Sequence, residues 1–253
     1  MVFAPAMALS DVQPETQTGG PPILPVPTFM ETGLPIYSMP VGTSSVLPPA
    51  GPGTGTGTAS PPGSSDALTT LDSRSWGALA ASNATAMGVN PSAIAATCML
   101  ETGCQSIAAV GGSTVSGAFQ MTNGTYSADI MQALAQNPSL AGTIDTSLAG
   151  KMDPANQAIA AAQDLKNAAL ALQAAGISSP SVMDTRGYFN FGAAVGSDLA
   201  RSPADRNMSD ILSAYYTPAQ IAQNGITPST TVGQWRASVA AKIGSAANQV
   251  VLL

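Results

Sequence analysis

Glu101 is the residue of this chain best suited to acid–base chemistry. It follows the apolar run AIAATCML, and it is the one acidic residue between Asn90 and Tyr126. Charged residues make up 9% of the chain, so a carboxylate directly after an apolar run stands out. A lone carboxyl group at the end of an apolar helix suits the acid that protonates the leaving oxygen when a glycosidic bond is cleaved.

The composition narrows the chemistry available to this site. The 253 residues include no histidine and two cysteines, which excludes Ser-His-Asp and Cys-His nucleophiles and histidine-based zinc sites. We expect no metal and no cofactor. Asp129, Asp145 and Asp153 are candidates for a second carboxylate by their order, but none lies in a motif typical of a nucleophile or base. A mechanism with one acid then needs help from the substrate, such as the N-acetyl group of an amino sugar.

A short helix must position Glu101. Asn90 followed by Pro91 is typical of a helix N-cap and first turn, and Gly103 supplies the stop. After a loop rich in Gly and Ser, the segment GAFQMTNGT reads as a compact turn. The rest of the chain is expected to be a scaffold around this stretch or an arm leading to it.

Other segments also show helical periodicity and cap signals, and none shows the sustained alternation of a strand. The predicted fold class is therefore mainly α. The expected helices run from about Ser73 to Met87, from Thr125 to Gln136, from Asp153-Pro154 to Ala175, from Ser181 into RGYFNFG, from Ser209 to Tyr216, from Thr217-Pro218 to Asn224-Gly225, and from Thr231 to Val250.

The N-terminal quarter of the chain has a different composition. Residues 1–66 are rich in Pro, Gly, Thr and Ser with almost no charge, so they are not expected to build a core of their own. Apolar residues are frequent between positions 21 and 48, so this part either docks as an arm on a partner protein or serves as a tether. The predicted division is an arm or linker at 1–66 and a helical domain with a C-terminal helical extension at 67–253.

Charge and hydropathy limit the partners. The formal net charge is -6 and Lys and Arg are not clustered, so nucleic acid is not an expected partner. No run of 18 apolar residues occurs, which predicts no transmembrane span. The N-terminal segment MVFAPAMALSD lacks a basic region and is interrupted by Pro5, so no signal peptide is predicted.

The two cysteines flank Glu101. Cys98 and Cys104 are six positions apart. If the helix ends between them, the turn could bring them together as a disulfide. Two small buried hydrophobic side chains are an equally good interpretation.

Three motifs around Glu101 resemble the lytic transglycosylase (SLT, goose-type-lysozyme-like) domain. That family has a helix ending in Glu-Ser, a Gly-x-x-Gln turn with a Thr five residues after the Gln, and a downstream Tyr-Asn-x-Gly. The matching segments here are Glu101-Thr102-Gly103, Gly117-Ala118-Phe119-Gln120 with Thr125, and Asn190-Phe191-Gly192. The resemblance covers roughly residues 73–200.

The resemblance implies a lysozyme-like helical domain that cleaves the β-1,4 bond between N-acetylmuramic acid (MurNAc) and N-acetylglucosamine (GlcNAc) in peptidoglycan. Glu101 would protonate the leaving oxygen. Its carboxylate would then accept a proton from the 6-hydroxyl of the muramic acid, which closes a 1,6-anhydro ring without water. The substrate contacts carried over from the family are Thr102, Gly117, Gln120, Thr122, Tyr188 and Asn190.

The chain departs from the family pattern at three places. Thr102 replaces the usual Ser, and Thr114-Val115 replaces a Gly-Ala pair before the turn, so the loop is expected to be reshaped. The family's Tyr, a hydrogen-bond partner of the Glu, falls on Phe189, with Tyr188 one residue earlier. Either Tyr188 substitutes through a local shift, or activity is reduced.

Three interpretations follow from the resemblance. The first is an active transglycosylase joined by its arm to a larger envelope-penetrating assembly, either a phage virion or a secretion or conjugation machine. It implies glycan strands and a protein partner of the arm as partners, and a virion-associated or periplasmic location. The second is a structural or hub protein of such an assembly with little activity. The third is a lysozyme that hydrolyses with water.

Overall fold

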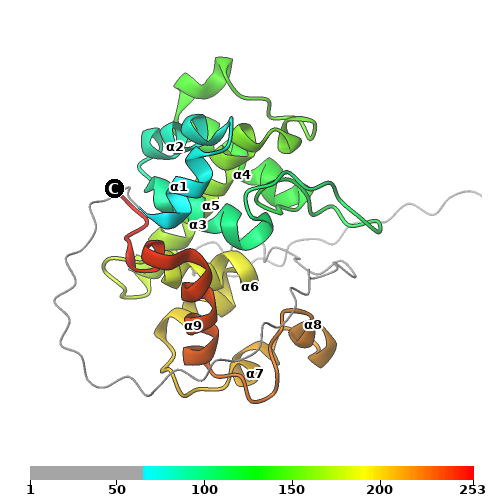
Figure 1. Ribbon diagram of the computed structural model, residues 1–253, viewed down its shortest axis with the longest axis vertical. Helices are drawn as coiled ribbons and strands as arrows, with labels where there is room; N and C mark the ends of the chain where they lie inside the picture. The colour runs from blue at the N-terminus through cyan, green and yellow to red at the C-terminus, as the bar shows by residue number, and fades with distance from the viewer. Residues whose placement is uncertain (1–64) are drawn as a thin grey trace, which may run out of the picture.

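The computed structural model describes residues 65–253, a range built from α-helices and short 3₁₀ helices (Figure 1). This confirms the predicted mainly α fold, while the predicted arm lies almost wholly outside the described residues. The β contacts among the described residues are isolated bridges. The elements are α1 (Asp66–Asp72), α2 (Gly77–Ala86), α3 (Pro91–Thr102), α4 (Asn123–Gln136), η1 (Pro138–Gly142), η2 (Gly150–Met152), α5 (Pro154–Ala174), α6 (Val182–Arg201), α7 (Met208–Leu212), α8 (Pro218–Gln223), α9 (Val232–Ile243) and η3 (Gly244–Asn248).

The helix that carries Glu101, α3, has the predicted ends. The Asn90 side chain accepts a hydrogen bond from the Ser92 amide, and Gly103 ends the helix in the left-handed conformation with φ 65°. Beyond the helix, Arg74 Nη2 donates to the Gly103 carbonyl at 2.8 Å. Residues 92–98 are buried, so α3 is a fixed part of the interior that brings its last turn towards the surface.

The long helix α5 organises the other helices. The Asp153 side chain accepts a hydrogen bond from the Ala155 amide at its N-terminus, as the Asp153-Pro154 signal predicts. Buried alanines along α5 allow α2, α4 and α6 to pack closely against it. No helix of residues 65–253, α5 included, has the length and apolar character needed to cross a membrane.

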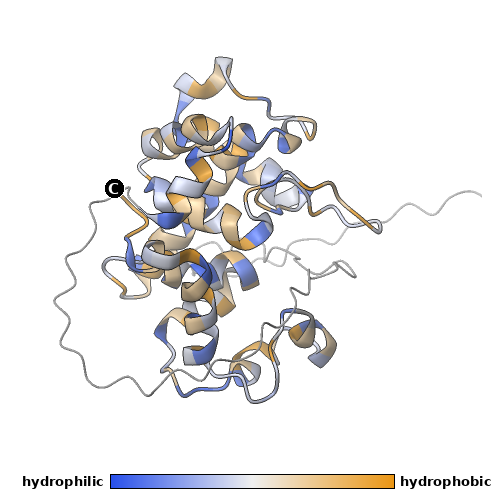
Figure 2. Ribbon diagram, viewed as in Figure 1, coloured by the Kyte–Doolittle hydropathy of each residue, from blue (hydrophilic) through white to orange (hydrophobic). Residues whose placement is uncertain are grey.

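The helices carry hydrophobic as well as hydrophilic residues (Figure 2), and two hydrophobic cores lie within the described residues. The larger draws on α1 to α5, the start of α6 and the C-terminal segment. The smaller comprises Phe191, Val195, Leu199, Met208, Ile211, Leu212, Ile221, Ile226 and Val232. Trp235 packs against both cores. In Figure 1 the smaller core corresponds to the region around α7, α8 and the adjacent parts of α6 and α9.

The helix α6 connects the two cores through a break at Gly192. This residue has φ 79° and ψ 174°, a backbone conformation that glycine adopts far more readily than other residues. Before the break, Phe189 packs in the larger core. Phe191 and the residues after the break pack in the smaller one. The first half of α6, which faces Glu101, is therefore anchored separately from the second half.

Some helix boundaries differ from the prediction. The helix expected from about Ser73 to Met87 begins later, at Gly77, and a separate helix that was not predicted, α1, precedes it and ends at Asp72. A Cβ on Gly77 would lie 1.9 Å from the Leu71 carbonyl oxygen, so the close approach of α1 and α2 sets this boundary. Helix α7 ends at Leu212 rather than Tyr216, and α9 ends at Ile243 because Gly244 leaves the helical conformation.

Candidate functional site

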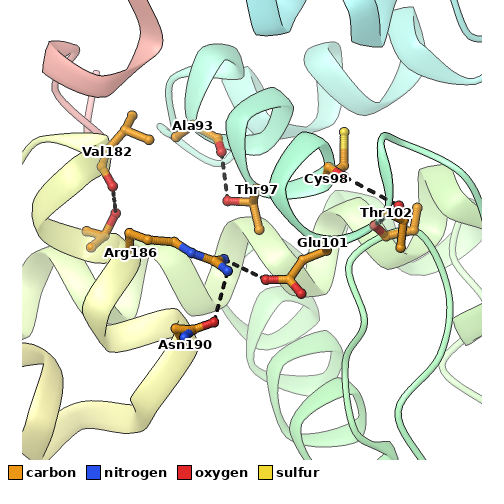
Figure 3. A network of polar contacts seen from close by, with 10 residues as sticks. Ala93, Thr97, Cys98, Glu101, Thr102, Val182, Arg186 and Asn190 are labelled. Atoms are coloured by element: carbon orange, nitrogen blue, oxygen red, sulfur yellow. Dashed lines mark hydrogen bonds and ion pairs between the residues drawn. The ribbon is translucent and has the colours of Figure 1, made fainter. Parts of the chain in front are cut away.

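Glu101 forms an ion pair with a residue that the motifs do not include. Its Oε1 lies 2.5 Å from Nη1 of Arg186 on α6, 85 positions further along the chain. Figure 3 shows the two side chains pointing towards one another from α3 and α6. The Glu101 side chain is 18% exposed and that of Arg186 is 11% exposed, so both are accessible from solvent while largely enclosed by protein.

Arg186 is held in place by its own helix. Its Nη2 donates to Oδ1 of Asn190 at 2.9 Å, an i,i+4 contact along α6 that Figure 3 also shows. The guanidinium carbon lies 5.9 Å from the centroid of the Phe189 ring, at the edge of the range for a cation–π contact. Asn190, a predicted substrate contact, therefore reaches Glu101 indirectly, through Arg186.

Thr102 ties the end of α3 to the predicted turn. Its hydroxyl donates to the Ala118 carbonyl at 2.8 Å and accepts from the Gln105 amide at 3.0 Å. Both interactions are with backbone groups of the protein. The residue predicted as a substrate contact thus places the turn beside Glu101.

A disulfide closes the segment that carries Glu101. Cys98 and Cys104 are bonded, with their Cα atoms 4.6 Å apart and both residues buried. Of the two interpretations open from the sequence, the structure has the disulfide. Glu101 lies inside the ring that this bond closes, so its backbone is restrained from both sides.

The Gly117 turn is fixed against α5 by a buried amide side chain. Gly117 has φ 85°, and a Cβ at this position would lie 2.1 Å from Oε1 of Gln157. The fully buried Gln157 accepts from the Phe119 amide at 3.1 Å and donates to the Ser116 carbonyl at 2.8 Å. Gly117 is therefore required by the packing of the turn against Gln157.

A buried cation holds the other side of the turn. Lys151, 3% exposed, donates from Nζ to the Thr114 carbonyl, to the Met121 carbonyl at 3.2 Å and to Oδ1 of Asn123 at 2.6 Å. Burial lowers the pKa of this lysine. The three acceptors compensate for its loss of hydration, so the loop and the start of α4 are joined through one side chain.

Gln120 and Thr122 follow in the same turn and remain partly exposed. Gln120 has φ 47°, a conformation uncommon for a non-glycine residue, and its Nε2 donates to the Gly117 carbonyl at 2.8 Å. The Thr122 hydroxyl caps α4 by accepting from the Thr125 amide at 3.0 Å. Both side chains stabilise the turn and still present surface to solvent.

Tyr188 is buried near Asp164 and Asp129 rather than paired with Glu101. It is 7% exposed, and burial raises its pKa to about 12, with further contributions from the charges of Asp164 and Asp129. Within residues 65–253 no hydrogen bond joins Tyr188 to Glu101. Phe189 packs into the larger core, and Arg186 is the polar partner of Glu101 in this structure.

The other carboxylates have separate roles. Burial, followed by the charge of Asp164, raises the pKa of Asp129, which accepts from Nδ2 of Asn167 at 3.3 Å. Hydrogen bonds from Ser147 lower the pKa of Asp145, and Asp153 caps α5. None of the three interacts with Glu101, so within the described residues the site has one carboxyl group.

Sequence reasoning missed Arg186, Gln157 and Lys151. A signal existed for Arg186, because it is one of eight Lys and Arg residues in the chain and precedes Asn190 by one helical turn. Gln157 and Lys151 carry no comparable signal, since only the packing of α5 and η2 against the turn gives them a role.

The site can exchange a proton and bind an anion. Glu101 supplies a partly exposed carboxyl group, and Arg186 supplies a guanidinium beside it. No model of a known protein family matches the chain, and no curated protein matches it. The functional interpretation therefore depends on the residues and contacts described above.

Proposed function

We propose that this protein is a peptidoglycan lytic transglycosylase that cleaves the MurNAc–GlcNAc β-1,4 bond and leaves a 1,6-anhydro-MurNAc end. One observation carries the proposal: the segments that resemble the family motifs meet at the last turn of α3. The turn is joined to it through the hydrogen bond from Thr102 to Ala118, and the α6 motif through the contacts of Arg186 with Glu101 and Asn190.

In this mechanism Glu101 acts first as an acid and then as a base. As an acid it gives its proton to the glycosidic oxygen while the bond to the anomeric carbon breaks. As a carboxylate it then takes the proton of the muramic acid 6-hydroxyl, and that oxygen closes the anhydro ring. One carboxyl group serves both steps, in agreement with the single carboxyl group found in this part of the described chain.

The site residues divide into two groups in the proposed enzyme. Gln120, Thr122 and Asn190 are partly exposed and would contact the sugar beside Glu101. Thr102 and Gly117 act through the protein, because their contacts shape the turn. Tyr188 is buried near Asp164 and Asp129, so in this enzyme it would support α6 rather than touch the sugar.

The chemistry of the cleaved ends tests the proposal. Purified peptidoglycan is digested with the full-length protein in water enriched in ¹⁸O, and the products are analysed by mass spectrometry. A transglycosylase yields anhydro ends without ¹⁸O, whereas a hydrolytic lysozyme yields reducing ends that contain ¹⁸O. Reducing ends alone would replace the proposal with the lysozyme interpretation.

A structural protein with little activity is the second candidate, and two observations favour it. The carboxylate of Glu101 is already paired with Arg186 in the structure. The position of the family Tyr is filled by Phe189, which has no hydroxyl group to offer Glu101. This candidate predicts that the protein releases no fragments from peptidoglycan of any source tested. A turnover number well above that of the Glu101→Gln variant would exclude it.

The N-terminal segment has a proposed role of its own, in attachment. We propose that residues 1–66 join the enzyme to a larger envelope-penetrating assembly, either a phage virion or a secretion or conjugation machine. Because α1 begins at Asp66 with Ser65 as its N-cap, a truncation should retain residues 65–253. The truncated protein should keep its cleavage of soluble glycan and lose its association with the assembly. Loss of cleavage would show that the segment belongs to the enzyme.

A further inference from the structure

We infer that Arg186 binds a carboxylate of the substrate and releases Glu101 when that carboxylate takes its place. The carboxylate is the lactyl group on C3 of the muramic acid ring. This inference rests on the proposed function and deepens it, since it assigns a specificity-determining role to a residue outside the family motifs.

The contacts of Arg186 leave it able to bind a second anion. A guanidinium has five N–H donors, and within residues 65–253 its hydrogen bonds go to Oε1 of Glu101 and Oδ1 of Asn190. Arg–carboxylate pairing is strongest when two parallel hydrogen bonds form. The pair with Glu101 uses one carboxylate oxygen and one Nη, so an incoming carboxylate can make a better contact.

The guanidinium does not depend on Glu101 for its position. Asn190 holds Nη2 from the next turn of α6, and the Phe189 ring lies beside the guanidinium carbon. Both partners belong to the same half-helix, before the break at Gly192. When Glu101 leaves, Arg186 therefore remains oriented, and its partly exposed side chain is accessible to a ligand.

The substrate carries a carboxylate close to the reacting bond. Glu101 would act at C1 of the muramic acid, and the lactyl ether is attached to C3 of the same ring. In a peptide-free strand this lactyl carboxylate is free and charged. In a peptide-bearing strand it is consumed in the amide bond to the stem peptide, so Arg186 should favour peptide-free strands.

Two monosaccharides provide the direct test, because MurNAc and GlcNAc differ only in the lactyl group. Their affinities for the full-length protein are measured by NMR titration. MurNAc should bind roughly tenfold more tightly, the size expected of a charge-assisted contact. Arg186→Gln should remove this preference, and Arg186→Lys should keep part of it. Arg201→Gln, an exposed site on the same helix with the same loss of charge, should keep all of it.

A second variant separates anion binding from a merely structural ion pair. Glu101→Gln removes the competing carboxylate, so the ratio of MurNAc affinity to GlcNAc affinity should rise. If Arg186 only braces α3 against α6, breaking the pair gives no such gain. Equal affinity for both sugars in the wild-type protein, or a preference that survives Arg186→Gln in a folded variant, would overturn the inference.

The outcomes distinguish this inference from the proposed function. Cleavage with anhydro ends, combined with equal binding of the two sugars, overturns the role of Arg186 and leaves the transglycosylase proposal intact. A MurNAc preference that depends on Arg186, without cleavage of any glycan, retains the anion site and overturns the transglycosylase proposal. Faster cleavage of peptide-free than of peptide-bearing strands, lost in Arg186→Gln, supports both.

Discussion

The two halves of the candidate site are held in different ways. The turn at Gly117–Gln120 is fastened by the buried side chains of Gln157 and Lys151, which hydrogen-bond to its backbone and to the flanking residues. The α6 half meets Glu101 through one ion pair between side chains that solvent still reaches. One half is therefore fixed by buried hydrogen bonds, and the other contacts Glu101 through a partly solvated ion pair.

The difference matters because the two kinds of contact differ in strength. Leaving one buried hydrogen-bonding group unsatisfied costs about 1–3 kcal/mol, whereas an ion pair at the protein surface contributes about 0–1 kcal/mol. The ion pair of Arg186 and Glu101 lies between these cases, because its side chains are 11% and 18% exposed. The turn should therefore keep its shape in the proposed enzyme, and the contact between Arg186 and Glu101 should open more readily than the turn, as the proposed exchange with a substrate carboxylate requires.

Substituting Gly117 should have the largest effect on stability. In Gly117→Ala the new Cβ would meet Gln157 at a position whose φ of 85° already disfavours alanine. We expect the free energy of unfolding to fall by about 3 kcal/mol, measured by urea denaturation. Gly112→Ala is the matched control, because Gly112 has φ 80° and no atom within 4 Å of a built Cβ. Equal losses in both variants would mean that the contact with Gln157 does not fix the turn.

Removing the Lys151 cation should have the next largest effect. Lys151→Met keeps the bulk of the side chain but removes the Nζ donor from three acceptors, of which the Met121 carbonyl still accepts from the Ser116 amide. The free energy of unfolding should fall by about 2 kcal/mol. Lys242→Met, at an exposed position, removes the same charge and should change stability little. A Lys151→Met protein as stable as the control would contradict the description of this half as buried and fixed.

Breaking the ion pair should cost much less. Arg186→Gln should lower the free energy of unfolding by about 1 kcal/mol, less than Lys151→Met, because both partners keep some contact with solvent. The same urea denaturation series provides the measurement. A loss comparable to that of Lys151→Met would show that α6 is fastened to α3 as firmly as the turn is to α5, which would contradict the comparison.

The acidic pair formed by Asp129 on α4 and Asp164 on α5 should make the free energy of unfolding depend on pH. Burial raises the pKa of both groups in the folded protein, whereas unfolded carboxyl groups titrate near pH 4. The folded state therefore binds more protons above that pH, so the contribution of this pair to the free energy of unfolding is greatest in acid and falls as the pH rises. Asp129→Asn should flatten this decline between pH 5 and pH 8. An unchanged slope would contradict the assignment.

Local signals in the sequence predicted the helices that begin at strong caps. Asn90-Pro91, Asp153-Pro154 and Thr217-Pro218 each pair a capping side chain with a first-turn proline, and each begins a helix in the structure. Helix α1 and the late start of α2 at Gly77 were not predicted, since this boundary depends on how closely Gly77 approaches Leu71. The contact joins the end of one helix to the start of the next, so the hydrophobic periodicity within a single helix cannot predict it.

The site was predictable where its chemistry is local. The position of Glu101 at the end of α3 followed from the cap, the apolar run and the stop glycine. Its pairing with Arg186 joins residues 85 positions apart, and the roles of Gln157 and Lys151 depend on which residues face the turn. These contacts are set by tertiary packing, which no spacing in the sequence encodes.

The most direct test of the central claim is the activity of Glu101→Gln on purified peptidoglycan. The wild-type protein should release fragments with 1,6-anhydro ends, and the variant should lose at least about a hundredfold of that activity, with its unfolding midpoint shifted no more than that of Arg186→Gln. Glu31→Gln is the matched control, because Glu31 stands in the same Glu-Thr-Gly sequence, and it should retain full activity. Undiminished cleavage by Glu101→Gln would contradict the account.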